Sequence, residues 1–316
     1  MTIVESRTQK ACVHEPAAAP DVPLIEARGL TKHYDGFSLQ DVGLDVNEGE
    51  VVGFVGKNGA GKSTTIKALL GLIELDGGQA RVLGVDAHAL GHDHAAARMK
   101  EQIGVVFDTV AMPGHLKVAD VARMYARAYS TWDQHAFDQF VREFDLEPCK
   151  LVKDLSRGMG MKLSLACALC HGARLLILDE ATAGLDPMAR DEILDRLRAF
   201  VAEPGHAVLM SSHITSDLER IADRVVCIDN GRIVFDLVKD QITDEMGIAR
   251  CRVADFERIA ASGIIPEHEL RYRKNDYGID VLVPDRFAFA ENFPGVPCDR
   301  MTIDDYLSLT LKGGVR

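Results

Sequence analysis

A glycine-rich segment behind a short apolar run limits what this chain can fold into more than any other feature. The run VVGFV at 51–55 is typical of a buried strand, and GKNGAGKST follows it from Gly56 to Thr64. Behind the loop, STTIKALLGLI carries apolar residues at a helical period. The sequence therefore predicts a strand, a flexible loop bracketed by Gly56 and Gly61, and a helix that begins at about Ser63.

This loop matches G-x-x-x-x-G-K-[ST] at every fixed position. Glycines let backbone N–H groups face a phosphate, and the N-terminus of the following helix attracts the same anion. Lys62 is expected to reach the β- and γ-phosphates, and the Ser63 hydroxyl is expected to bind Mg²⁺. A turn with a chance lysine is the alternative, and the flanking strand and helix disfavour it. The residues of this loop expected to bind ATP are Gly56, Asn58, Gly59, Gly61, Lys62, Ser63 and Thr64.

A phosphate-binding loop of this kind needs a carboxylate on a neighbouring strand, and LLILDE at 175–180 supplies one. Asp179 ends the apolar run and is expected to hold Mg²⁺ through water. Glu180 follows it and is placed to polarise an attacking water as a general base. An acidic pair that only caps a strand is the alternative. The glycine loop in the same sequence disfavours it, because such a loop needs a carboxylate of this kind.

Strands and helices alternate along most of the chain, which predicts an α/β fold with a mostly parallel sheet. Residues 1–22 are polar and rich in Ala and Pro and are expected to be a disordered extension. We expect a main domain at 23–238, with a mostly helical lobe at about 86–165. Residues 239–316 predict a small α+β appendage made of a helix, a hairpin around Asn275–Gly278 and a final helix.

Composition restricts the partners. The net charge of −12 argues against a nucleic-acid backbone as the main partner, because such domains need clustered Lys and Arg. No apolar run approaches the roughly 20 residues of a membrane helix, so any work at a membrane needs a second, spanning chain. Seven scattered cysteines suit a reducing compartment, and Cys167 and Cys170 are expected to be buried helix residues.

Three further motifs narrow the class. DLSRGMG at 154–160 precedes the acidic strand end, AGLDP at 183–187 follows Glu180, and SSH at 211–213 ends the next apolar run. With the loop and the carboxylates, these resemble the signature, D-loop and H-loop of the ABC-type ATPases, in that family's order. The resemblance covers about residues 24–236.

The resemblance implies a P-loop nucleotide-binding fold with an antiparallel β subdomain and a helical lobe. It also implies a head-to-tail dimer in which each P-loop faces the signature of the other subunit. Ser156 and Gly158 then contact ATP across the dimer, and Asp186 links the two sites. Tyr34 matches the aromatic residue that stacks on adenine, and His213 matches the residue that contacts the γ-phosphate and orients Glu180. A surface Tyr and a turn Asp remain the alternatives for Tyr34 and Asp186.

Two motifs depart from the family pattern. Asp108 stands where the family usually has Gln; it is expected to reach Mg²⁺ but cannot donate a hydrogen bond to water. LSRGM replaces the common LSGGQ, so that Arg157 adds a cation near the shared phosphate site and Met159 removes an amide.

The favoured function is the cytosolic, ATP-hydrolysing subunit of an ABC transporter, with ATP and Mg²⁺ as cofactors. It would act as a homodimer or heterodimer, peripheral on the inner face of the cell membrane, with a separate integral membrane permease. The final helix resembles that of exporter-type subunits and weakly favours export. The alternatives are a non-transport ABC ATPase that associates with nucleic acid or ribosomes, and a nucleotide-gated regulatory module.

One histidine cluster lies outside these motifs. His88, His92 and His94 have a spacing compatible with metal ligation, but no Cys or carboxylate framework accompanies them beyond Asp93. A solvated loop is therefore the favoured interpretation.

Overall fold

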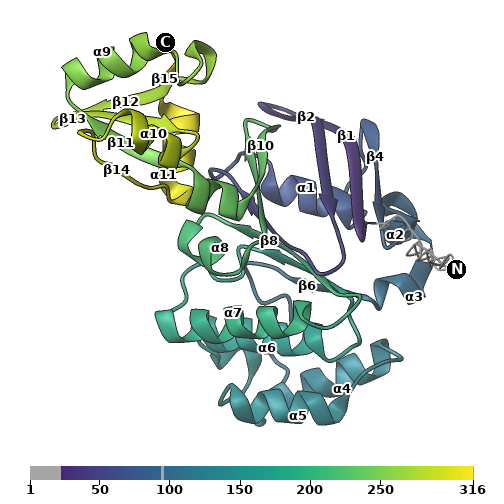
Figure 1. Ribbon diagram of the computed structural model, residues 1–316. Coiled ribbons are helices and arrows are strands. Elements are labelled where there is room, and N and C mark those ends of the chain that lie inside the picture. Colours follow the sequence, from purple (N-terminus) through teal and green to yellow (C-terminus); the bar gives the residue numbers. More distant parts are fainter. Residues whose placement is uncertain (1–22, 94–95, 316) are drawn as a thin grey trace, which may run out of the picture.

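The computed structural model describes residues 23–93 and 96–315, which form three sheets with helices packed around them. Figure 1 shows the arrangement, with the C-terminal residues set to one side of the larger body. The extension expected at 1–22 lies outside the described residues. No helix in the described ranges is both long and apolar enough to cross a bilayer.

The central sheet has six strands in the order β10-β9-β3-β8-β7-β6. Neighbouring strands from β9 to β6 run parallel, and β10 returns antiparallel through the turn at Asn230–Gly231. The strands predicted from the apolar runs are thus confirmed, and their runs are apolar because helices or another sheet cover both faces. Their bounds are β3 (Val51–Val55), β6 (Ile103–Val106), β7 (Leu175–Asp179), β8 (Ala207–Ser212), β9 (Arg224–Asp229) and β10 (Arg232–Val238).

Alternate residues of these strands enter two apolar cores. Leu176, Leu178 and Met210 belong to the core under the helices that follow the signature and the D-loop. Ile177 and Leu209 point the other way, into the core that the first helix shares with the antiparallel strands. The covering helices are α1 (Lys62–Leu69), α6 (Arg157–Leu169), α7 (Pro187–Val201) and α8 (Thr215–Ile221).

A four-stranded antiparallel sheet, in the order β2-β1-β4-β5, packs beside α1. It is the antiparallel β subdomain that the resemblance implied. Its elements are β1 (Ile25–Tyr34), β2 (Phe37–Val46), β4 (Gly77–Val82) and β5 (Val85–Asp86), followed by α2 (Ala87–His92) and α3 (Ala97–Lys100).

The helical lobe is less uniform than expected for 86–165, because β6 lies inside that range and belongs to the central sheet. After β6, the lobe consists of α4 (Val118–Ala128), α5 (Gln134–Glu143), the turn η2 (Val152–Asp154) and the start of α6. Phe137 and Val121 share one apolar core with Met161 and Leu165 of α6, and α6 contacts α4, α5 and β6, so α6 joins the lobe to the sheet.

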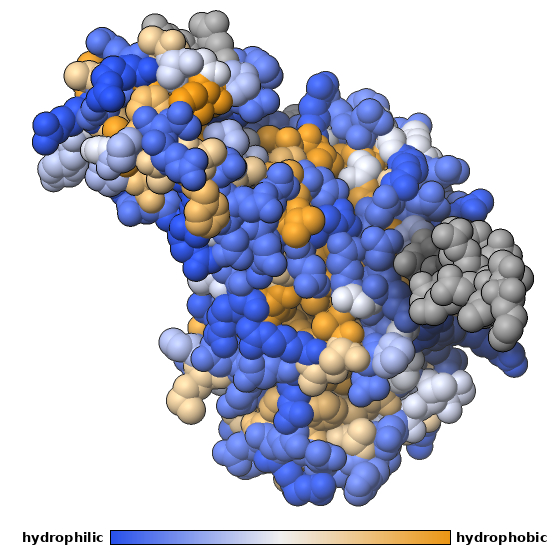
Figure 2. Space-filling model, viewed as in Figure 1, coloured by the Kyte–Doolittle hydropathy of each residue, from blue (hydrophilic) through white to orange (hydrophobic). Residues whose placement is uncertain are grey.

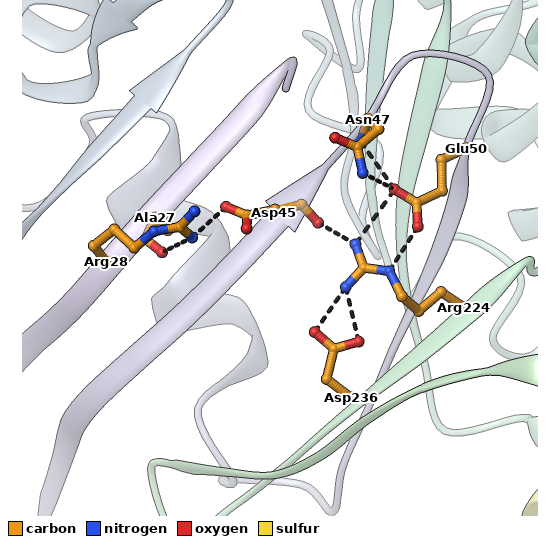
Figure 3. Close-up of polar contacts among 7 residues, drawn as sticks. All are labelled: Ala27, Arg28, Asp45, Asn47, Glu50, Arg224 and Asp236. Carbon is orange, nitrogen blue, oxygen red and sulfur yellow. Dashed lines mark hydrogen bonds and ion pairs between the residues drawn. The ribbon is translucent and has the colours of Figure 1, made fainter. Parts of the chain in front are cut away.

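Arg224 fastens the antiparallel sheet to the central one, as Figure 3 shows. Its guanidinium donates to Glu50 Oε1 at 2.6 Å, to both carboxylate oxygens of Asp236 at 2.7 Å, and to the Asp45 carbonyl at 2.6 Å. Asp45 also pairs with Arg28. Burial works against the charged form of Arg224, but the bonds to Glu50 and Asp236 outweigh it and raise the pKa above its ordinary value.

We expect Arg224→Ala to lower the free energy of unfolding by about 2–3 kcal/mol, because it leaves Glu50 half-buried without its cation. Arg232→Ala is the matched control, since Arg232 also reaches the antiparallel sheet, at Gln40, but is exposed. Urea unfolding followed by circular dichroism measures both. Equal, small effects of the two variants would contradict a stabilising role for the Arg224 contacts.

The C-terminal domain (residues 239–315) is larger than the helix, hairpin and helix expected from the sequence. It forms a five-stranded antiparallel sheet in the order β14-β11-β13-β12-β15. The predicted hairpin is confirmed, with Asn275 paired to Gly278. Its elements are η3 (Gln241–Glu245), β11 (Gly247–Cys251), α9 (Val253–Ser262), η4 (Glu267–Glu269), β12 (Arg271–Asn275), β13 (Gly278–Val283), α10 (Arg286–Asn292), β14 (Cys298–Arg300), α11 (Ile303–Lys312) and β15 (Gly314–Val315).

Helix α11 joins this domain to the rest. Ile303 and Leu309 are fully buried in the same apolar core as Leu218 and Ile221 of α8. The Ile303 backbone N–H donates to Glu219 Oε1 at 2.7 Å. Figure 2 shows polar residues over most of the visible face, with apolar residues exposed next to the place where the C-terminal domain meets the main body.

Candidate functional site

The glycine loop between β3 and α1 has the conformation that its sequence predicts. The Gly61 φ of +122° is one that side chains rarely allow. A Cβ on Gly56 would lie 2.3 Å from the Ile228 carbonyl oxygen, so only glycine fits there. Asn58 and Gly59 are exposed at the loop tip, and α1 begins at Lys62 directly behind them.

Lys62 is folded back into this loop. Its side chain is 6% exposed, and its ammonium donates to the Gly56 carbonyl at 2.7 Å. The same ammonium lies 3.2 Å from Glu180 Oε1. Ser63 and Thr64 follow in the first turn of α1 and are half-buried. The loop therefore presents a preformed cation and a helix N-terminus at one place, which suits an anionic ligand.

The two carboxylates at the end of β7 are held differently. Asp179 is buried and accepts from the Ser211 hydroxyl at 2.6 Å. Glu180 has a left-handed backbone, with φ of +54°, and its N–H donates to the Ser211 side chain and backbone oxygens. This uncommon backbone conformation turns the Glu180 carboxylate away from the strand direction, toward the glycine loop.

His213 closes the constellation from the end of β8. Its Nδ1 lies 2.5 Å from Glu180 Oε2, and its backbone N–H donates weakly to the same oxygen at 3.4 Å. Half of the His213 side chain remains exposed. Lys62, Glu180 and His213 thus form one connected cluster, in which Glu180 bridges a buried cation and an accessible imidazole.

The signature and the D-loop form a second cluster. The Ser156 hydroxyl accepts from Met159 N–H at 3.2 Å and caps α6, and Asp186 caps α7 by accepting from Ala189 N–H at 3.0 Å. That backbone bond lowers the pKa of Asp186. A Cβ on Gly158 would lie within 4.0 Å of Asp186 Oδ2, which places the two motifs side by side.

Several predicted site residues stay apart from the Lys62 cluster. In the described ranges, Ser156, Gly158 and Asp186 make no hydrogen bond or ion pair with the glycine loop. Tyr34 ends β1 and is 46% exposed, with the Lys32 ammonium 5.8 Å from its ring centroid. Asp108 is exposed behind β6.

Two features of the site were missed from the sequence. Ser211 was noted only as part of the SSH motif, yet it ties Asp179 to the Glu180 backbone. Helix α11 lies far away in sequence, yet it walls a cavity of about 240 Å³ beside the glycine loop and His213. Ser211 could have been predicted as a site residue, because it places a hydroxyl near the end of β8, the strand next to β7. Nothing in the residues of α11 predicts that this helix lies beside the glycine loop.

The histidine cluster and the Cys167–Cys170 pair do not form a metal site within the described residues. His88 and His92 lie on the helix α2, which corrects the expected loop, and their rings are 4.7 Å apart. His94 lies outside the described residues, within which no group of three potential metal ligands occurs. Cys167 is buried in α6 as predicted, and Cys170 is buried directly after the helix, as its C-cap. Burial raises the pKa of Cys170 to about 12.

The oxygen donors present fit a hard divalent cation such as Mg²⁺. Asp179 is a buried carboxylate with one oxygen bonded to Ser211, and Ser63 has a hydroxyl at the start of α1. In the part of the chain that the structure describes, the Ser63 side chain makes no hydrogen bond, which leaves its oxygen available.

Comparisons with known proteins agree with this geometry. The family model described as ABC transporter matches residues 39–183. The chain is 34% identical to an uncharacterized ABC transporter ATP-binding protein of Bacillus subtilis, YhcH, over 70% of this chain and 72% of that protein. It is 32% identical to the bacitracin transport ATP-binding protein BcrA of Bacillus licheniformis, covering 69% and 71% of the two chains. It is also 32% identical to the daunorubicin/doxorubicin resistance ATP-binding protein DrrA of Streptomyces peucetius, covering 78% and 75%.

Solved structures share the fold. An ATP-binding subunit of an ABC transporter superposes with a TM-score of 0.62 at 30% identity, over 69% of this chain and 91% of that one. A dimeric ATP-binding cassette bound to ADP and Pi superposes with a TM-score of 0.61 at 20% identity, over 68% and 98%. These matches decide between the transport and non-transport alternatives. The chain belongs to the ABC transporter family and is an ATP-hydrolysing subunit of such a transporter.

Proposed function

We propose that this chain binds Mg–ATP on its glycine loop, pairs head to tail with a second ATPase subunit, and drives export through a separate permease. The observation that carries the proposal is the connected cluster of Lys62, Glu180 and His213 in front of α1. Without nucleotide, Glu180 neutralises Lys62. A triphosphate in the loop would take over Lys62 and leave Glu180 with His213 alone.

The roles of the cluster follow from this exchange. Lys62 and the backbone N–H groups from Gly56 to Thr64 would hold the phosphates. Glu180 would accept the proton of the attacking water, with its position fixed by His213 on one side and by Ser211 through the backbone on the other. His213 is half exposed and would face the γ-phosphate.

Mg²⁺ would be held by Ser63 and Asp179, with Asp108 as a further carboxylate reaching toward it. When bound, it neutralises charge on the β- and γ-phosphates. The Ser211 bond to Asp179 keeps that carboxylate pointed out of β7.

The second subunit would complete the site. Ser156 and Gly158 stand at the N-terminus of α6, where backbone N–H groups can meet a γ-phosphate that is bound to another chain. Asp186 packs beside Gly158 and would carry this contact toward the active site. Tyr34, at the exposed end of β1, would stack on the adenine.

A surface groove of the main domain is a candidate docking site for the permease. It has a volume of about 290 Å³ and lies between β6, α1, α2 and the lobe. Leu72 is 59% exposed at its rim, and Phe107 is the residue before Asp108. The lining residues are Leu70, Leu72, Leu90, Gly91, Lys100, Ile103, Val105, Phe107 and Tyr129. An apolar helix of a membrane partner would fill it, and the chain would then act on the inner face of the membrane.

Export is favoured because the similar proteins include a bacitracin transporter subunit and a daunorubicin/doxorubicin resistance subunit. The test is purification of the tagged chain from detergent-solubilised membranes together with the membrane protein that binds it, followed by measurement of ATP hydrolysis in liposomes. We expect a stable complex, and we expect Leu72→Asp to abolish it because a charge would be desolvated in an apolar groove.

Val234→Asp is the matched control, since Val234 is an equally apolar, 41% exposed residue on β10 outside the groove. It should leave the complex intact. A complex that survives Leu72→Asp would refute the groove as the docking site, and failure of the wild type to bind any membrane protein would refute the transport proposal.

A further inference from the structure

The cavity beside His213 has one wall from each domain. The main domain contributes the end of β3, the start of the glycine loop and the H-loop, and α11 contributes Asp304, Leu307, Ser308, Leu311 and Lys312. Leu307, Leu311 and Val55 make part of the lining apolar. Lys57 and Lys312 contribute cations, Asp304 contributes one carboxylate, and Lys57 lies 3.9 Å from Asp229. With two lysines against one carboxylate in its lining, the cavity suits an apolar side chain that is accompanied by a carboxylate.

Helix α11 is held in place from both domains. Ile303 and Leu309 are buried in the core that contains Leu218 and Ile221 of α8, and the cavity residues Leu307 and Leu311 pack against the edge of that core. Arg273 of β12 donates to the Ser308 hydroxyl at 2.5 Å and to the buried Asp280 at 3.2 Å, and this ties α11 to the C-terminal sheet as well. A preformed wall loses little conformational entropy when something packs on it.

An apolar side chain lies exposed in the D-loop region. Met188 is the second residue of α7 and is 75% exposed, which is a large exposed fraction for an apolar side chain of this size. Asp186 stands two residues before it and is also exposed. Met188 and Asp186 together have the chemistry that the cavity accepts.

The strand order shows how the two features can meet. The central sheet runs β3-β8-β7-β6, so the glycine loop, the H-loop and the D-loop follow one another along its carboxyl edge. The signature lies beside the D-loop, since Gly158 is next to Asp186. In a two-fold dimer, the signature of one copy lies over the glycine loop of the other. Along the shared edge, the loops of the second copy then run in the opposite order to those of the first. The D-loop of the second copy then lies opposite the H-loop of the first, where the cavity opens.

We propose that, in the ATP-bound pair, Met188 of a second copy of this chain packs against Leu307 and Leu311 of α11. Asp186 of that copy then faces Lys57 and Lys312. The C-terminal domain thus forms part of the dimer interface and contacts the partner's D-loop directly. This inference rests on the proposed head-to-tail pairing and adds α11 to it.

Cross-linking tests this contact. Met188→Cys and Leu311→Cys are combined in full-length chain that carries Glu180→Gln, with the exposed Cys149 and with Cys12, outside the described residues, replaced by Ser. A short bis-maleimide is added with and without Mg–ATP. We expect a covalent dimer that depends on ATP and on both cysteines.

The control pairs Met188→Cys with Val253→Cys. Val253 is 62% exposed on α9, which Figure 1 shows away from the main body, whereas α11 lies next to α8. This pair should stay uncross-linked. An ATP-dependent dimer seen by size-exclusion chromatography, but without a Met188–Leu311 cross-link, overturns the inference and leaves the proposed function standing. A chain that stays monomeric with ATP also overturns the inference, because two copies then do not pair.

A second measurement needs no cross-linker. We expect Met188→Ser to weaken ATP-dependent dimerisation about tenfold, the effect typical of losing a buried interface side chain. Met124→Ser is the control, since Met124 is another exposed methionine, 38% accessible, on α4. Equal affinity of Met188→Ser and wild type, measured by analytical ultracentrifugation, contradicts the contact.

Discussion

Glu180→Gln is expected to lower the rate of ATP hydrolysis by about 100-fold to 10,000-fold, which is the range that a general base contributes. Gln has the shape of Glu but accepts no proton at neutral pH. The change also removes the charge that holds Lys62 in the resting chain. ATP should therefore bind at least as tightly as before and remain uncleaved, so that the closed pair persists.

Phosphate release at saturating Mg–ATP measures the rate, and light scattering during size-exclusion chromatography measures the pair. Glu203→Gln serves as the control, because Glu203 is an exposed carboxylate before β8 and touches no part of the cluster. Turnover within a few fold of the wild type would remove Glu180 from the role of base. Loss of turnover together with loss of ATP binding would instead indicate a folding defect, which the melting temperature identifies.

Lys62→Ala is expected to weaken ATP binding at least about 100-fold, the equivalent of ~3 kcal/mol for truncating one partner of a buried charge pair. The Lys62 side chain is 6% exposed and already bonded to the Gly56 carbonyl, so it is positioned before the nucleotide arrives. Within the described residues, the Glu180 carboxylate contacts Lys62 and the His213 ring, so Lys62 is the only permanent cation among its partners there. A fluorescent ATP analogue titrated into the purified chain gives the affinity.

Lys67→Ala is the control for this variant, since Lys67 lies on the same helix but faces solvent. The double variant with Glu180→Gln adds a sharper criterion. Because Glu180 neutralises Lys62 in the resting chain, the effects of the two changes on ATP affinity should not add. Additive effects on ATP affinity would show that Glu180 does not compete with the triphosphate for Lys62.

The sequence predicted the parts of the site that lie within short motifs. The glycine loop, Asp179, Glu180 and His213 each follow a buried strand, and parallel strands bring their carboxyl ends to one edge. The neighbours that decide the position of Glu180 were harder to predict. Ser211 acts through one hydroxyl, and α11 reaches the site only after a whole domain has folded.

The C-terminal sheet was underestimated for a related reason. Its edge strands β14 and β15 have three and two residues, too few to show an alternating pattern. They pair with strands tens of residues away, at Gly247 and Arg271, so only the tertiary fold creates them. The roles assigned to Tyr34, Asp108 and Ser156 remain predictions, because each depends on a molecule other than this chain.

The burial of Ile303 and Leu309 against α8 bears on how the C-terminal domain can be studied. A shortened protein that ends after Val238 would expose Leu218 and Ile221 to water and would lose the bond from Ile303 to Glu219. Such a truncation would be prone to aggregate, and its inactivity would say little about regulation. Single replacements of the exposed cavity residues Asp304 and Lys312 keep the shared interior intact, and they are the appropriate way to ask what this domain contributes.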